Sequence, residues 1–297
     1  MNVDSILTMR NLNKKFKGFV LDVPSLDIPK GFSTALIGEN GAGKTTLFHL
    51  LSGTRLDFKG DIDYFQGEKE ERTIRELIGY TSTTGYFMPH WSISQVGEVG
   101  ELLYDSFNRE KYQKLLVELA VKEPEGKKKK DKAVSKLSDG MRMKVMLASV
   151  FARDTRLLLL DEPASPLDPL MRDKLCNMIR DYIHEGAGEK SVFFSTHNIA
   201  DMESVTDYAI IMEKGQVVEQ GFVEELKEKY IAVKGESADA GKAAQVMYSI
   251  QQNNYGFEGI CLAENLNKLA GMDIATETPN LSQISVAVMK HYTNLQS

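Results

Sequence analysis

A glycine-rich segment near the start of the chain has the residue types and spacing of a phosphate-binding loop. Residues 38–46, GENGAGKTT, match the pattern G-x-x-x-x-G-K-[ST] in full. Glycines allow successive backbone N–H groups to converge on an anion at the positive end of a helix dipole. Lys44 adds a charge for the β and γ phosphates of a nucleotide, and the Thr45 hydroxyl completes a magnesium shell. The expected nucleotide-binding residues are Gly38, Asn40, Gly41, Gly43, Lys44, Thr45 and Thr46.

Two adjacent acidic residues supply the second half of such a site. Asp161 and Glu162 follow the apolar run 157–160, which has the character of a buried strand. A strand of this kind delivers carboxylates from its end to a nucleotide pocket. Asp161 suits magnesium, directly or through water, and Glu162 lies on the opposite side of the chain, where it can act as a general base. An Asp-Glu pair is weak evidence alone, but after a complete phosphate loop it predicts nucleotide hydrolysis.

Residues 137–141, LSDGM, resemble the signature motif of the ATP-binding cassette (ABC) family. The order of phosphate loop, helical insertion, signature, acidic strand end and residues 195–197, STH, is also that family's order. The similarity covers residues 7–221. It implies a head-to-tail pair of cassettes, as a homodimer or a heterodimer, in which each ATP with its Mg²⁺ lies between one subunit's phosphate loop and the other's signature helix.

The resemblance also implies roles for five further residues. Ser138 and the backbone N–H of Gly140 would face the γ-phosphate across the dimer, at the start of a helix. His197 resembles the switch histidine that contacts the γ-phosphate and the attacking water, which makes it the second catalytic residue beside Glu162. Asp168, in a loop resembling the one that crosses the dimer, would communicate between the two sites. Phe16 occupies the place of the aromatic side chain that stacks on adenine, although a packing role stays open and Phe19 is a rival.

The chain departs from the family's pattern at two positions. Thr83 stands where a glutamine normally contacts magnesium and water, so any metal contact there is expected to be weaker or indirect, and Gln95 is too far along to substitute. Asp139 replaces a glycine of the signature. Its carboxylate must point away from the phosphates, because it would otherwise repel them.

Strands and helices alternate around these motifs. Residues 33–37 form an expected strand that leads into the phosphate loop, and 44–51 an expected helix after it. The apolar runs 157–160 and 191–195 are separated by a helical stretch, 170–185. Strand, helix and strand with buried strands predict a parallel sheet. We therefore expect an α/β fold of the P-loop NTPase (RecA-like) type with a mainly parallel sheet.

The remaining segments predict additions to this core. Glycines and prolines punctuate residues 6–37, which indicates short strands and a small N-terminal antiparallel β layer. Helical periodicity dominates a subdomain at about 85–151. Short helices are expected at 224–230 and 281–292. The predicted division is an ATPase domain, 1–221, and a C-terminal α/β module, 222–297.

Composition and charge limit the partners. A net charge of −6 argues against nucleic-acid binding, and the basic run 127–130 is expected to be a solvated loop rather than a docking patch. Two distant cysteines indicate neither a disulfide framework nor a zinc site. The sequence shows no signal peptide or membrane span. We therefore expect a cytoplasmic protein held at the inner face of the membrane by a separate permease, and residues 86–91 (YFMPHW) either contact that permease or pack on the core.

The family's members differ in what ATP drives. A single cassette with a modest tail resembles the ATPase subunits of bacterial exporters, so transport in the export direction is the leading expectation. The alternative is a soluble cassette protein that acts on ribosomes or nucleic acid, but such members usually have two cassettes or long coiled coils. A nucleotide-binding regulator without turnover is disfavoured by Lys44, Asp161, Glu162 and His197 together.

Overall fold

A six-stranded sheet forms the centre of the computed structural model, which describes residues 3–82, 87–121 and 133–296. In order across the sheet the strands are β5 (Ile78–Thr81), β6 (Leu157–Leu160), β7 (Ser191–Thr196), β3 (Ser33–Ile37), β8 (Tyr208–Glu213) and β9 (Gln216–Phe222). All neighbours pair in parallel except β8 and β9. The predicted mainly parallel α/β core is thus confirmed.

A second, antiparallel sheet is formed by β1 (Ser5–Phe16), β2 (Phe19–Pro29) and β4 (Lys59–Tyr64), with β1 in the middle. We expected short strands here, but β1 and β2 pair along nearly their whole lengths. Prolines are tolerated because β2 is an edge strand, where a missing N–H breaks no ladder. This sheet, helix α1 (Lys44–Leu51) and one face of the central sheet share one apolar core. The core fixes α1, and with it the phosphate loop.

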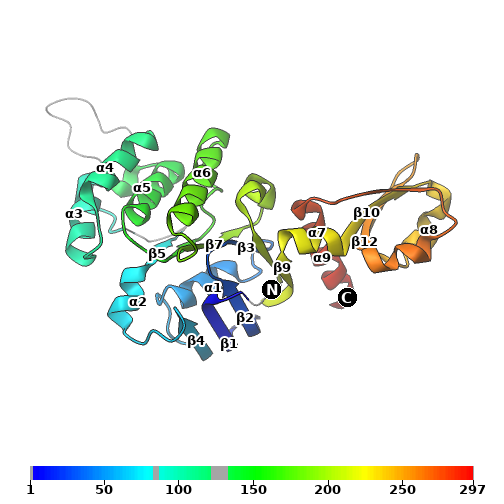
Figure 1. Ribbon diagram of the computed structural model, residues 1–297, viewed down its shortest axis with the longest axis horizontal. Coiled ribbons are helices and arrows are strands. Elements are labelled where there is room, and N and C mark those ends of the chain that lie inside the picture. The colour runs from blue at the N-terminus through cyan, green and yellow to red at the C-terminus, as the bar shows by residue number, and fades with distance from the viewer. Residues whose placement is uncertain (1–2, 83–86, 122–132, 297) are drawn as a thin grey trace.

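Helices cover the other face and one end of the central sheet (Figure 1). They are α2 (Glu71–Leu77), α3 (Ile93–Leu103), α4 (Arg109–Glu118), α5 (Asp139–Phe151) and α6 (Pro169–Glu185). Ser92 and Gln95 form a capping box at the start of α3, so Gln95 has a structural role rather than the role of the missing glutamine. Segment 71–81, which becomes α2 and β5, was not predicted as an element.

The C-terminal part of the chain forms a four-stranded antiparallel sheet of its own, with strand order β11-β12-β10-β13. Its elements are α7 (Val223–Lys229), β10 (Tyr230–Gly235), α8 (Ala240–Ala243), β11 (Met247–Gln252), β12 (Phe257–Leu262), β13 (Ile274–Glu277) and α9 (Leu281–Gln296). Val233, Ala243, Phe257 and Cys261 belong to a small separate core under this sheet. The predicted C-terminal α/β module is therefore present.

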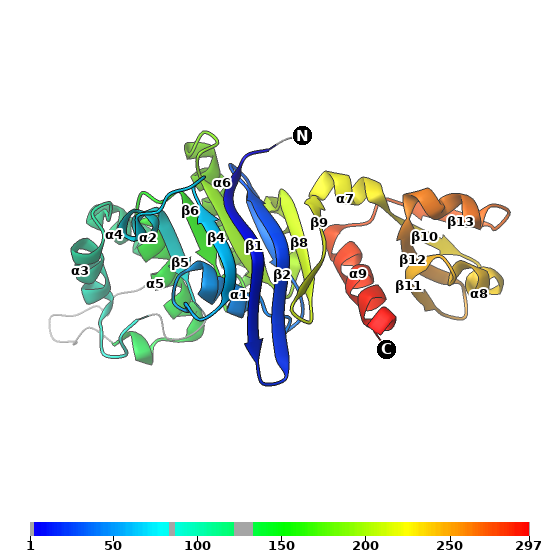
Figure 2. The same ribbon diagram turned by 90° about the horizontal axis from the view of Figure 1, so that it is seen from below.

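Helix α9 lies between the central six-stranded sheet and the four-stranded C-terminal sheet (Figure 2). Its buried residues Leu281, Ile284, Ala287 and Val288 belong to the large core that also contains β8 and the helical segments. A domain boundary at 221 stays a prediction, because α9 follows that boundary in sequence but packs on elements that precede it.

Candidate functional site

The phosphate loop adopts the backbone that its glycines permit. Gly41 and Gly43 have φ of 90° and 108°, and a Cβ added to Gly38 would lie 2.4 Å from the carbonyl oxygen of Met212. The side chain of Lys44 is only 5% exposed. Its ammonium group donates to the carbonyl oxygens of Gly38 at 2.8 Å and Glu39 at 3.2 Å. The loop therefore holds the ammonium group close to its own backbone.

Asp161 is fully buried at the end of β6 and faces α1. Its Oδ1 accepts hydrogen bonds from the Ser195 hydroxyl at 2.6 Å and from the Thr45 hydroxyl at 3.3 Å. Burial raises the pKa of Asp161 above its ordinary value, against the lowering effect of these two bonds. Asp161 and Thr45 thus lie in contact, although they are far apart in the sequence. Both were expected to bind the same metal ion.

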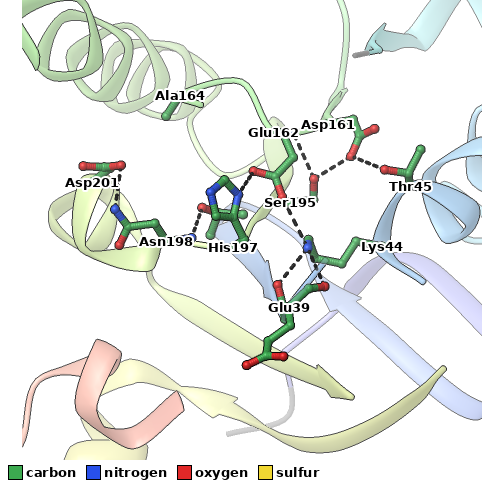
Figure 3. Close-up of polar contacts among 12 residues, drawn as sticks. Glu39, Lys44, Thr45, Asp161, Glu162, Ala164, Ser195, His197, Asn198 and Asp201 are labelled. Carbon is green, nitrogen blue, oxygen red and sulfur yellow. Dashed lines mark hydrogen bonds and ion pairs between the residues drawn. The ribbon is translucent and has the colours of Figure 1, made fainter. Parts of the chain in front are cut away.

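Glu162 turns to the other side of the chain, as the sequence indicated (Figure 3). Its backbone has φ of 47°, which is unusual for a residue with a side chain and typical of functional sites. Carboxylate Oε1 lies 3.3 Å from Lys44 Nζ, and Oε2 lies 2.7 Å from His197 Nδ1. The two expected catalytic residues are therefore in direct contact, and one of them also contacts the phosphate-loop lysine.

Ser195 is a site residue to which the sequence analysis gave no role. Its hydroxyl donates to Asp161 and accepts from the Glu162 backbone N–H at 2.9 Å. One hydroxyl thereby fixes both acidic residues. The available signal was a serine directly after the apolar residues Val192, Phe193 and Phe194, near the end of strand β7.

The donor set around Asp161 fits a magnesium ion. Asp161 Oδ2 is buried without a hydrogen-bond partner, and the Thr45 hydroxyl adjoins the other carboxylate oxygen. Mg²⁺ prefers hard oxygen ligands and usually binds one or two protein groups together with phosphates and water. The described residues hold no group of three or more acidic, histidine or cysteine side chains that could bind a metal. Thr83, the third suggested ligand, lies outside the described residues.

The signature residues lie at the start of α5. Ser138 caps this helix by accepting from the Met141 N–H at 3.3 Å, and the Asp139 carboxylate pairs with Arg142. A Cβ on Gly140 would lie 2.7 Å from the carbonyl oxygen of Pro166. The signature motif is therefore closely packed against the loop that contains Asp168. Within the described part of the chain, Ser138 and Gly140 form no hydrogen bond with the phosphate loop.

Asp168 and Phe16 have local partners of their own. Asp168 caps α6 by accepting from the Met171 N–H at 3.1 Å. Phe16 lies at the end of β1, is 37% exposed, and has the Arg55 guanidinium 5.2 Å from its ring centroid. Its rival Phe19 packs against Gly43, where an added Cβ would come within 2.9 Å of the ring. The more exposed Phe16 is thus the freer of the two to stack on a base.

The sequence of this chain is similar to sequences of known proteins. A family model described as "ABC transporter" matches residues 21–165. The chain is 31% identical over 218 residues to the tungstate uptake system ATP-binding protein TupC of Peptoclostridium acidaminophilum, covering 72% of this chain and 97% of that protein. The chain belongs to the ABC transporter family. It is also 29% identical to the L-cystine import ATP-binding protein TcyC of Bacillus subtilis (strain 168), covering 74% of this chain and 92% of the relative.

A solved structure agrees with the ABC fold. An ATP-binding subunit of an ABC transporter superposes with a TM-score of 0.63 at 23% identity, covering 75% of this chain and 92% of that one. By its membership of the ABC transporter family, the protein is an ABC-type ATPase subunit. Within the described ranges, no helix is both long and apolar enough to cross a membrane.

Replacing Asp161 with asparagine is expected to stabilise the ABC cassette while it impairs turnover. A carboxyl group whose pKa is raised on folding binds its proton more tightly in the folded state, so ionisation above the ordinary value of 3.8 opposes folding. We expect Tm at pH 7, measured without nucleotide, to rise by about 2–4 °C. This rise corresponds to a gain on the order of 1 kcal/mol in the free energy of unfolding. The gain should shrink as pH falls through the raised pKa.

The same variant should lose at least about tenfold in magnesium-dependent ATPase activity, because an amide is a poorer ligand for a hard cation. Differential scanning fluorimetry and phosphate release measure the two effects. A fall in Tm at pH 7 would contradict the interpretation of Asp161 as an electrostatically strained metal ligand.

Proposed function

We propose that residues 38–46 bind the triphosphate of ATP and that Glu162 is the general base of its hydrolysis. The observation that supports this most strongly is the contact of Glu162 with both Lys44 and His197. A triphosphate held by the loop brings its γ-phosphate to Lys44, which is beside the carboxylate that must accept a proton from water. His197 orients that carboxylate through its second oxygen.

Thr45 and Asp161 are proposed to hold Mg²⁺. When bound, the ion neutralises charge on the β and γ phosphates. Ser195 keeps Asp161 in place and at the same time fixes the backbone at Glu162. Thr83 remains a weaker proposed ligand. Phe16 is the proposed adenine-stacking residue.

A second cassette subunit is proposed to complete the site. Ser138, Gly140 and Asp168 would act across a head-to-tail dimer, since within one chain Ser138 and Asp168 cap helices α5 and α6. The start of α5 offers backbone N–H groups and a positive helix dipole to the partner's γ-phosphate. The partner is either a second copy or a different cassette.

The dimer is proposed to act at the inner face of the membrane, where ATP binding and hydrolysis drive an integral membrane permease. The relatives' names state uptake of tungstate and import of L-cystine, which favours import and gives no support to the export expected from the sequence. Met88 is 56% exposed, whereas Phe87 and Trp91 pack on the core. Within segment 87–91, Met88, Pro89 and His90 are exposed and are proposed to contact the permease, and Tyr86 lies outside the described residues.

Purification of the tagged protein from its host membranes in mild detergent tests the cellular role. A multi-span membrane protein is expected to co-purify, and ATPase activity of the complex should respond to transport substrate. Recovery with ribosomes or nucleic acid instead would favour the soluble alternative. If transport is reconstituted in vesicles, the side on which the substrate accumulates establishes the direction.

A further inference from the structure

The turn that joins β8 to β9 lies directly against the phosphate loop. The N–H of Gly215 donates to the carbonyl oxygen of Ala42 at 2.9 Å, and the Asp22 N–H donates to the carbonyl oxygen of Gly215 at 2.8 Å. At the start of the loop, Gly38 has no room for a Cβ beside Met212 of β8. The turn therefore packs against the phosphate loop along one side.

The last turns of α9 hold this β8–β9 turn from outside. The Tyr292 hydroxyl donates a hydrogen bond to Oε1 of Gln216, the residue next to Gly215. Glu213 is 8% exposed at the other end of the turn. Burial and the like charge of Glu39 raise the pKa of Glu213, and a side-chain hydrogen bond with Thr293 opposes this rise. The hydrogen bond from Tyr292 to Gln216 is therefore the contact by which the end of α9 holds the turn.

The position of α9 is itself fixed at several points. The Leu281 N–H donates to Glu203 Oε1 at 3.0 Å, and the helix also contacts residues 199–201, just after His197. Toward the C-terminal sheet, the His291 ring stacks on Tyr248 with centroids 4.0 Å apart. Figure 3 shows this helix, in salmon, beside the strands that run to the site. Because α9 contacts both sides, the C-terminal sheet is mechanically connected to the phosphate loop.

We propose that Tyr292 is a positioning residue for ATP binding: through Gln216 it holds the β8–β9 turn against the phosphate loop, so that the C-terminal module sets the affinity for nucleotide. This inference rests on the proposed binding of ATP by residues 38–46. Tyr292 touches neither phosphate nor the catalytic residues in this chain. Its effect should therefore appear in nucleotide affinity and not in the chemical step.

The test is Tyr292→Phe in the full chain, which removes only the hydroxyl. One hydrogen bond contributes a net factor of about two to ten to an equilibrium constant, so the Kd for ATP and the KM should rise by about two- to tenfold. We expect kcat to stay within about twofold of the wild type. Tyr255→Phe is the matched control, because Tyr255 is 95% exposed in the β11–β12 turn and loses the same group.

A double-mutant cycle separates positioning from general loss of structure. Gln216→Ala removes the acceptor, and Tyr292→Phe combined with Gln216→Ala should bind ATP no more weakly than the worse single variant. Unchanged ATP affinity in Tyr292→Phe overturns the proposal, whatever its Tm. So does an equal loss in the Tyr255 control, or additive losses in the double variant. Failure of the wild-type protein to bind ATP would instead refute the proposed function itself.

Discussion

Glu162→Gln is expected to reduce steady-state ATP turnover by about 10²–10⁴-fold, the usual contribution of a general base. The amide cannot accept the proton of the attacking water, but it keeps the size of the side chain. ATP affinity should be retained or increased. The carboxylate Oε1 that attracts Lys44 becomes neutral, so the phosphates compete with a weaker partner for the ammonium group. Phosphate release and calorimetric titration with ATP measure the two parameters, and size-exclusion chromatography with ATP should detect a trapped dimer.

A control for this variant is Glu264→Gln, which makes the same chemical change at an exposed position of the C-terminal module. Its turnover should equal that of the wild type. Full ATPase activity in Glu162→Gln would exclude Glu162 as the base. The remaining candidate for orienting water would then be His197, which already contacts Glu162.

Lys44→Ala is expected to act on binding itself. A hydrogen bond to a charged group contributes about 1.5–3 kcal/mol, so the loss of the ammonium group should raise the Kd for ATP by about 10- to 150-fold. Lys44 is nearly buried, and its contacts converge on the carbonyls of Gly38 and Glu39 and on Glu162. Removing it therefore also leaves the Glu162 carboxylate without its nearest cation, which disfavours a bound triphosphate further.

Calorimetry with ATP and Mg²⁺ measures this loss, and Lys69→Ala provides the comparison, since the Lys69 side chain is 79% exposed and far from the loop in sequence. An unaltered Kd in Lys44→Ala would show that residues 38–46 do not hold the phosphates. The two variants are distinguishable by design: Glu162→Gln lowers kcat with affinity intact, whereas Lys44→Ala lowers affinity.

The parts of the site that are local in sequence could be predicted. The phosphate loop, the helix at 44–51 and the strands at 33–37 and 157–160 each depend on patterns within a few residues. This helix and these two strands match the structure to the residue. That Asp161 and Glu162 point in opposite directions follows from their adjacency at a strand end. Parallel strands bring their carboxyl ends to one edge, which is why Asp161 and His197 lie near one site.

Features that depend on tertiary pairing could not be predicted. The role of Ser195 depends on β7 lying beside β6 in the sheet, a long-range contact that single-chain periodicity does not encode. The packing of α9 on the large core could not be predicted either, because the apolar face of this helix is compatible with packing on either sheet. The sequence indicated a helix at 281–292, and α9 continues to Gln296, where its last turns reach the β8–β9 turn.

The shared core of α9 has a consequence for how the protein is made. Domains generally fold as units during synthesis, with earlier segments first. The apolar surface formed by β8, residues 199–205 and α7 is complete once α7 leaves the ribosome, but the helix that covers it is translated only after all four strands of the C-terminal sheet. The nascent chain therefore exposes this apolar surface to solvent until α9 has been translated.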